Sequence, residues 1–349
     1  MSTIYDVAAR AKVSPKTVSR VLNGDAPVGE KTRALVENAI RELGYVPSQA
    51  ARMMRSNKSG LIGLITGAIS RNAEPTEPSG LPDLHIVQGI QQYMAENGMT
   101  LMIADTGGAL DRVAPLIQTF QEHRVEGLIY VSDYHREIDL SGAVATCPVH
   151  LVNCYDASGL PCVLPDDRAG QKALTERLIA HGHRRIAYVT LDGRMDATSL
   201  RSQGYQDALA LAGIPFDPTL LIEGHVQDAH DANDRLARAI DDLLALPQPP
   251  SVICCGNDEM ALRLYGHLRR RGLRVPEEIS IAGFDNYRAI AETLFPPLTT
   301  VELPYRLMGR RVAERLIAQI SGQSTSDFTA SELIAAPVVW RASVTAIPK

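Results

Sequence analysis

The chain has 349 residues, a formal net charge of −5 and a hydrophobic fraction of 45%. This length predicts two or three domains, and the balance of apolar and charged residues excludes a disordered or fibrous chain. The sequence lacks the run of about 18 apolar residues that a transmembrane helix needs, and Asp6 and Arg10 interrupt the segment where a secretory signal would be apolar. We therefore expect a protein that stays inside the cell.

The charge is unevenly distributed along the chain. Residues 1–58 contain ten Lys and Arg but only five Asp and Glu, whereas residues 59–349 contain 25 basic and 35 acidic residues. A short basic segment before a long acidic one indicates that the first part binds a polyanion. A solvated basic surface is the alternative, which charge alone does not exclude.

Two short helices are predicted at the N-terminus. Thr3 and Asp6 have the spacing of a capping box, so the first helix should begin at Ile4. Ser14 is a good N-cap and Pro15 suits the first helical position, so a second helix should run from about Pro15 to Asn23. Two helices joined by so tight a turn form a helix-turn-helix.

The second predicted helix has two different sides. Its apolar residues should pack inward, and the opposite side carries Lys16, Ser19, Arg20 and Asn23 at helical spacing. Lysine and arginine bind guanine or phosphate, and asparagine pairs with adenine, so this side suits the major groove of DNA. The solvent-facing side of any surface helix explains the pattern equally well.

A third helix is expected from about Glu30 to Leu43, with Gly44 as its C-terminal cap. Its buried stripe should comprise Leu35, Val36, Ala39, Ile40 and Leu43. The segment after Pro47 has the length of one marginal helix. Met54 in it is suited to wedge between base pairs in a minor groove, or to rest on the neighbouring domain as part of a linker.

From residue 60 onward, short apolar runs alternate with helical patterns. Such alternation predicts an α/β fold with parallel sheets built from βαβ units. The expected strands are Leu61–Thr66, Leu101–Ala104, Gly127–Val131, Val149–Asn153, Ile186–Thr190, Ser251–Cys255 and Ile279–Phe284, and the helices include His85–Glu96, Gln171–Ala180, Ser199–Leu211 and Asp258–Arg271. A segment this long should form two subdomains with a ligand between them.

The N-terminal motifs resemble the headpiece of LacI/GalR-type bacterial transcription regulators. They include Ile4-Tyr5-Asp6-Val7-Ala8, Thr17-Val18-Ser19-Arg20-Val21-Leu22-Asn23 and Glu42-Leu43-Gly44-Tyr45-Val46-Pro47. Later motifs, among them Gly204-Tyr205, Asn257-Asp258 and Gly283-Phe284-Asp285-Asn286, resemble the periplasmic-binding-protein-like domain of the same family.

The resemblance implies three parts of the chain. A helix-turn-helix headpiece should span residues 1–47, a hinge helix and linker residues 48–59, and an effector-binding and dimerisation body residues 60–349. The two subdomains of the body are expected at about 60–161 with 292–321, and at 162–291 with 322–349.

The resemblance also implies the residues that contact DNA. Pro15, Lys16 and Arg20 occupy base-reading positions, and Met54 stands where the family usually has the intercalating leucine of its hinge helix. Arg55 is expected to contact phosphate. The positions that contact or support the DNA backbone are Tyr5, Ser14, Thr17, Ser19 and Asn23.

For the effector, the resemblance points first to Arg201 and Asp285, whose guanidinium fork and carboxylate together suit a polyol. An ion pair between the subdomains is the alternative for these two. The other matching positions, expected at strand ends, are Ser132, Asp133, Asn153 and Asn257, although Asn257 fits a helix cap equally well. Phe284, Tyr155 and Tyr134 are candidates for an aromatic face.

Other functions are less consistent with the sequence. His181 and His183 lack a clustered third metal ligand, the five cysteines form no C-x-x-C pair, and no nucleotide-binding or acyl-transfer motif is present. An α/β enzyme would leave the helix-turn-helix unexplained, and a secreted solute-binding protein would need an export signal. The loop from Arg71 to Asp83 either closes over the ligand or is a surface loop without a role.

We therefore expect a transcription regulator that is controlled by a ligand and needs no cofactor or metal. It should repress carbohydrate-utilisation genes from a roughly palindromic operator in double-stranded DNA. The effector should be a sugar or glycoside, with a purine-like compound as the alternative. Because residues 340–349 contain no heptad repeat, we expect a homodimer and not a tetramer.

Overall fold

The computed structural model describes residues 2–23, 28–46, 58–67, 81–140, 142–223, 232–323 and 330–347. The chain divides into two compact units, Met1–Gly60 and Leu61–Lys349. Within the described ranges, no helix has both the length and the apolar character needed to cross a bilayer.

The described residues of the first unit form three helices: α1 (Ile4–Ala11), α2 (Pro15–Asn23) and α3 (Glu30–Leu43). All three predicted starts are confirmed. The capping box of Thr3 and Asp6 is present at α1, and the Ser14 hydroxyl accepts a hydrogen bond from the Thr17 N–H at the start of α2. Gly44 ends α3 with a φ of 57°, a left-handed conformation that glycine adopts without strain.

The core of this unit differs from the prediction at one position. Val7, Val18 and Val36 are fully buried at its centre, but Leu35 is 55% exposed and does not belong to the buried stripe of α3. Val36 and Ala39 already define the inward side of this helix. Leu35 precedes Val36 by one residue, a rotation of about 100°, and so faces away from the core.

Within its described residues, the second unit contains two six-stranded sheets, each the centre of one lobe. All strand pairs in these residues are parallel except the antiparallel pair of β10 and β12. The first lobe has the order β11-β5-β4-β3-β1-β2, with bounds β1 (Leu61–Thr66), β2 (Thr100–Asp105), β3 (Gly127–Ile138), β4 (Val149–Asp156), β5 (Cys162–Pro165) and β11 (Ser331–Ile334). The second lobe has the order β12-β10-β9-β8-β6-β7, with bounds β6 (Ile186–Thr190), β7 (Leu221–Glu223), β8 (Val252–Cys255), β9 (Ser280–Asp285), β10 (Thr299–Glu302) and β12 (Val338–Val339).

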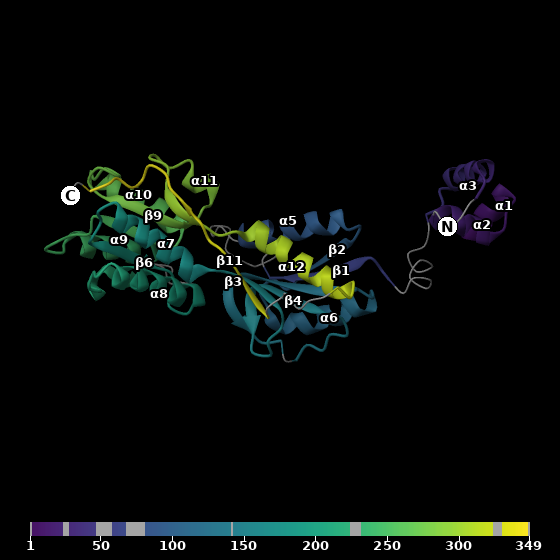
Figure 1. The fold of residues 1–349 in the computed structure, drawn as a ribbon, viewed down its shortest axis with the longest axis horizontal. Coiled ribbons are helices and arrows are strands. Elements are labelled where there is room, and N and C mark those ends of the chain that lie inside the picture. The colour runs from purple at the N-terminus through teal and green to yellow at the C-terminus, as the bar shows by residue number, and fades with distance from the viewer. Residues whose placement is uncertain are drawn as a thin grey trace. The chain divides into compact units, whose positions relative to one another are not determined.

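Helices cover both faces of each sheet, as parallel sheets require. On the first lobe, α5 and α12 pack side by side on one face, and α6 packs on the other (Figure 1). These helices have the bounds α5 (Leu81–Glu96), α6 (Val113–Glu122) and α12 (Tyr305–Ile320). The second lobe carries α7 (Asp167–Ala180), α8 (Asp196–Leu211), α9 (Ala232–Leu244), α10 (Asp258–Arg270) and the short α11 (Arg288–Ala291). The described residues also include two 3-10 turns, Leu110–Arg112 and Pro218–Leu220.

The chain passes between the lobes later than the resemblance implied. It leaves the first lobe after β5, returns between β10 and α12, and leaves again between β11 and β12. The expected passages near 161, 292 and 321 each precede these points. The reason is that β5, β10 and β11 are short strands that complete their own sheets before the chain crosses.

Gly204 allows a close approach of two helices, α7 and α8, in the second lobe. A Cβ atom there would collide with the carbonyl oxygen of Arg168 and lie 3.0 Å from the backbone nitrogen of Lys172, both on α7. Gly266 on α10 is a matched contrast, because a Cβ there would meet no atom within 4 Å.

We expect Gly204→Ala to lower the free energy of unfolding by about 1–3 kcal/mol, since α7 and α8 must move apart. Gly266→Ala should raise it by up to about 1 kcal/mol through helix propensity. Urea unfolding followed by the fluorescence of Trp340, the sole tryptophan of the chain, measures both. Equal effects of the two substitutions would contradict this account of the helix contact.

Candidate DNA-reading helix and effector site

The two sides of α2 follow the prediction at Val18, Val21, Lys16 and Arg20, whereas Ser19 is half-buried. Val18 is fully buried and Val21 is 9% exposed against the other two helices, while Lys16 and Arg20 are exposed one helical turn apart. Hydrophobic burial of one side therefore holds the two cationic side chains on the other side of the helix.

The other predicted DNA-contacting residues have varied exposure. Tyr5 on α1 is 71% exposed, Ser14 is exposed, and Pro15, Thr17 and Ser19 are half-buried. Asn23 ends α2, but its side chain lies outside the described part of the structure. Met54, Arg55 and most of the expected hinge segment also lie outside the described residues.

Arg201 lies at the centre of a buried polar cluster in the second unit. It is 4% exposed on α8, its Nε donates to Asp167 Oδ1 over 2.7 Å, and its Nη1 donates to the Gly256 carbonyl over 2.6 Å. Burial alone would lower the pKa of Arg201, but the charges of Asp167 and Asp285 raise it above its ordinary value. The guanidinium therefore stays charged.

Asp167 connects this arginine to the first lobe. His135 Nδ1, on β3, lies 2.9 Å from Asp167 Oδ2 at the start of α7. Burial opposes ionisation of Asp167, but Arg201 and the hydrogen bond from His135 outweigh it and lower the pKa of this carboxyl. An ionised carboxylate can only accept hydrogen bonds, so the proton between the two residues is on His135 Nδ1, which donates to Asp167. Sequence reasoning missed both residues, and one of the two lies in a different lobe from Arg201.

Phe284 does not supply the aromatic face expected of it. Its ring is fully buried, and the Arg201 guanidinium carbon lies 3.7 Å from the ring centroid. The ring supports Arg201 by a cation–π contact and has no free face for a ligand. Tyr134 is likewise engaged, by Arg136, whose guanidinium carbon lies 4.6 Å from its ring centroid.

Asp285 is half-buried at the end of β9 and has an unusual backbone, with φ of 120°. Strain of this kind concentrates at ligand sites. Burial raises the pKa of Asp285 well above the ordinary range, and the charge of Asp258 adds to this rise while Arg201 opposes it. Its carboxyl group has no hydrogen-bond partner among the described residues. Among the described residues Asp285 forms no ion pair with Arg201, which pairs instead with Asp167 of the same lobe.

Three of the remaining predicted effector residues lie within strands and not at strand ends. Ser132 and Asp133 lie within β3, which continues to Ile138 through an irregularity in its pairing, and Asn153 lies within β4. Ser132 and Asp133 both contact Arg136, and the Asn153 amide donates to the Ser132 carbonyl over 3.0 Å. Asn153 has a φ of 60°. These two strands extend beyond the apolar runs that the sequence showed, because their polar continuation still pairs.

Asn257 caps a helix, which is the alternative that the sequence left open. Its side chain accepts a hydrogen bond from the Met260 N–H at the start of α10, over 2.8 Å. The following residue, Asp258, is fully buried and accepts hydrogen bonds from the Thr300 hydroxyl and the Tyr287 N–H. Burial raises the pKa of Asp258 to about 7, although both hydrogen bonds oppose that shift.

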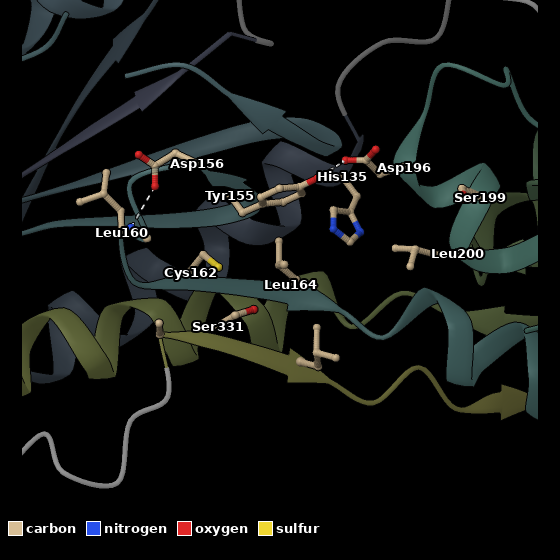
Figure 2. A pocket seen from close by; sticks show the side chains of 13 residues that line it. His135, Tyr155, Asp156, Leu160, Cys162, Leu164, Asp196, Ser199, Leu200 and Ser331 are labelled. Atoms are coloured by element: carbon tan, nitrogen blue, oxygen red, sulfur yellow. Dashed lines mark hydrogen bonds between the residues drawn. The ribbon is translucent and has the colours of Figure 1, made fainter. Parts of the chain in front are cut away.

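A pocket of about 500 Å³ lies beside this cluster (Figure 2). Strands β4, β5 and β11 of the first lobe and the first turn of α8 line it, together with His135. None of the seven residues predicted to bind the effector lines it, although Tyr155, the third aromatic candidate, does.

His181 and His183 make structural contacts. His181 follows the last residue of α7, stacks on Trp340 and is followed by Gly182 with φ of 94°. His183 contacts Ser251 and the Thr345 carbonyl. The cysteines are free thiols, and no cluster of His, Cys, Asp and Glu suited to a metal ion occurs among the residues that the structure describes.

The raised pKa of Asp258 predicts a dependence of stability on pH. A carboxyl whose folded pKa lies near 7 and whose ordinary value is 3.8 stabilises the fold fully below pH 4, and this contribution is lost as pH rises through 7. We expect Asp258→Asn to remove that loss, so that stability falls less between pH 5 and 8 than in the parent chain.

The measurement is the free energy of unfolding at several pH values, followed by Trp340 fluorescence. Asp111→Asn, which removes an exposed carboxylate, is the matched control and should retain the slope of the parent chain. Parallel profiles for the parent chain and Asp258→Asn would show that Asp258 is ionised throughout this range.

Comparison with known proteins places these features in one family. A profile described as "Bacterial regulatory proteins, lacI family" matches residues 3–48, and one described as "Periplasmic binding protein-like domain" matches residues 175–344. The HTH-type transcriptional repressor PurR of Vibrio atlanticus (strain LGP32) is 33% identical over 325 residues, which are 92% of each chain.

Two solved structures share nearly the whole chain. The lac repressor dimer bound to operator and the anti-inducer ONPF has a TM-score of 0.81 and 25% identity, and 99% of each chain is covered. The complex of the transcriptional regulator CelR with cellobiose has a TM-score of 0.66 and 29% identity, covering 98% of this chain and 100% of the other. The chain therefore belongs to the LacI family of bacterial regulatory proteins and is a DNA-binding transcription repressor.

Proposed function

We propose that this repressor reads one half of a roughly palindromic operator through Lys16 and Arg20. Both cationic side chains are exposed one turn apart on α2, which supports this role. An arginine donates two parallel hydrogen bonds to guanine O6 and N7, and lysine binds the same edge less specifically. Pro15 has no side-chain donor or acceptor, so most of the discrimination between sequences falls on these two residues.

The surrounding residues position the helix on the DNA backbone. Tyr5, Ser14, Thr17, Ser19 and Asn23 are proposed to contact or support contacts to phosphate, which fix orientation but carry no sequence information. Arg55 and Lys58 add phosphate contacts, and Met54 enters the minor groove between base pairs.

Arg20→Ala should relax base preference, lowering discrimination between operator and mutated operator by about 1–3 kcal/mol at the base pair it contacts. Lys58→Ala should instead weaken binding to all sequences alike and reduce the salt dependence. Fluorescence anisotropy with both duplexes at several salt concentrations measures both effects. Unchanged discrimination by the Arg20→Ala protein would contradict its role in base reading.

We propose that the effector is a small polyol, a sugar or a glycoside, bound at Arg201 and Asp285. Asp285 supports this proposal most directly, because its backbone is strained, the residue is half-buried, and its carboxyl group has no hydrogen-bond partner among the described residues. A carboxyl with a raised pKa can donate as well as accept, so it matches a hydroxyl in either orientation. The CelR complex with cellobiose is consistent with this class of effector.

A purine-like effector is the second candidate, and the relatives named PurR favour it. A purine base is best held by stacking on an aromatic face. Phe284 offers none, because Arg201 covers the buried ring. The polyol is therefore the better match to the described residues.

The repressor is proposed to act in the cytoplasm as a homodimer, as the lac repressor dimer does on its operator. Two headpieces would then read the two half-sites. The effector switches binding only if its affinities for the DNA-bound and free states differ. Ser132, Asp133, Asn153 and Asn257 are proposed to border the site, where their present contacts would rearrange on binding.

Asp285→Asn should abolish the response to effector while leaving operator affinity unchanged. The amide keeps the shape of the side chain, and asparagine tolerates a positive φ better than most residues do. A thermal-shift screen with monosaccharides, disaccharides and nucleobases identifies the effector first, because a ligand that binds only the folded chain raises Tm. Gel shifts with and without that ligand then test the substitution, and loss of operator binding as well would indicate a structural role for Asp285.

A further inference from the structure

The pocket in Figure 2 is formed by both lobes of the second unit. The first lobe contributes strands β4, β5 and β11, and the second contributes Asp196, Ser199 and Leu200 from the first turn of α8. The hydroxyl of Tyr155 donates to Asp196 Oδ2 over 2.9 Å and so joins the two lobes at the rim. A molecule in this pocket would touch both lobes at once.

The pocket is separate from the effector site proposed above, although the two are adjacent. His135 lines the pocket and contacts Asp167, which in turn binds Arg201. Neither Arg201 nor Asp285 reaches the lining. The histidine ring therefore lies between the pocket and the Arg201 guanidinium.

The lining combines an apolar floor with negative charge. Leu160, Leu164, Leu200 and Leu333 supply aliphatic surface, and Leu333 is 57% exposed, which is unusual for a leucine in a sheet. Asp156 and Asp196 are carboxylates, and among the described residues of the lining none is lysine or arginine. A volume of about 500 Å³ is typical of small-molecule sites.

The two carboxylates differ in what they offer a ligand. Asp156 already accepts hydrogen bonds from the Leu160 N–H and the Ser158 hydroxyl, which fix the turn after β4. Asp196 accepts from Tyr155 through Oδ2 only, and its Oδ1 has no hydrogen-bond partner among the described residues. The helix dipole places a partial positive charge at the N-terminus of α8, which offsets only about half of one carboxylate charge. The pocket therefore favours a cation, which Asp196 would anchor.

We propose that this pocket is a second ligand site, specific for a small organic cation with an apolar body. The ammonium group binds Asp196 Oδ1, and the apolar body covers the leucine side chains of the floor. Because both lobes supply contacts, the ligand stabilises the spacing of the lobes seen here. This ligand would regulate the protein independently of the proposed polyol effector.

Calorimetric titration of the full chain with phenethylamine tests the proposal, with phenylpropionate as the anionic counterpart of similar shape. We expect saturable binding of one phenethylamine per chain and none of phenylpropionate. Asp196→Asn should weaken phenethylamine binding about tenfold or more, since a charged hydrogen bond is lost. Asp111→Asn, which removes one exposed carboxylate elsewhere, should bind as the parent chain does.

Two further variants separate the possible outcomes. Ser199→Trp should abolish binding by filling the pocket from an exposed helix position, and its unchanged unfolding curve would show that the chain still folds. Asp285→Asn should leave phenethylamine binding intact even if it eliminates the response to the effector. Equal binding by Asp196→Asn, Asp111→Asn and the parent chain, or loss of binding only in Asp285→Asn, would overturn the proposal.

Discussion

The buried ion pair between Arg201 and Asp167 is the interaction on which the effector site depends. A buried charge is stable only when an opposite charge and hydrogen bonds compensate for the water it has lost. Removing one partner of such a pair typically costs about 3–5 kcal/mol. Here the Asp167 carboxylate has two partners, Arg201 from its own lobe and His135 from the other lobe. The pair therefore organises the second lobe and also links it to the first.

The same pair bears on the unusual chemistry of a neighbouring carboxyl group. Asp167 already neutralises the charge of Arg201, so Asp285 gains less from that guanidinium than its burial costs, and its pKa is raised. Phe284 adds a second constraint, because its ring holds the guanidinium in one plane. Arg201 is thus fixed before a ligand arrives, which lowers the entropy lost on binding.

Local chemistry made much of the fold predictable from the sequence. The capping box of Thr3 and Asp6, the pair Ser14-Pro15 and Gly44 mark helix ends by interactions within a few residues, and all were confirmed. The site was harder to predict because its partners are distant in sequence. His135 and Asp167 are 32 residues apart and belong to different lobes, and Phe284 was misjudged because its burial under Arg201 depends on tertiary contacts. The polar continuations of β3 and β4 were missed for the same reason, since hydrophobic pattern does not record strand pairing.

The order in which the two sheets are completed has a consequence for how the chain folds during synthesis on the ribosome. Five of the six strands in the second sheet come from the continuous stretch 186–302, whereas the first sheet needs β11, and its packing needs α12. A nascent chain can therefore assemble most of the second lobe while the first still exposes the apolar face that α12 will cover. That face, with Ile86, Ile90 and Ile129 at its centre, is the surface that chaperones would have to protect until translation ends.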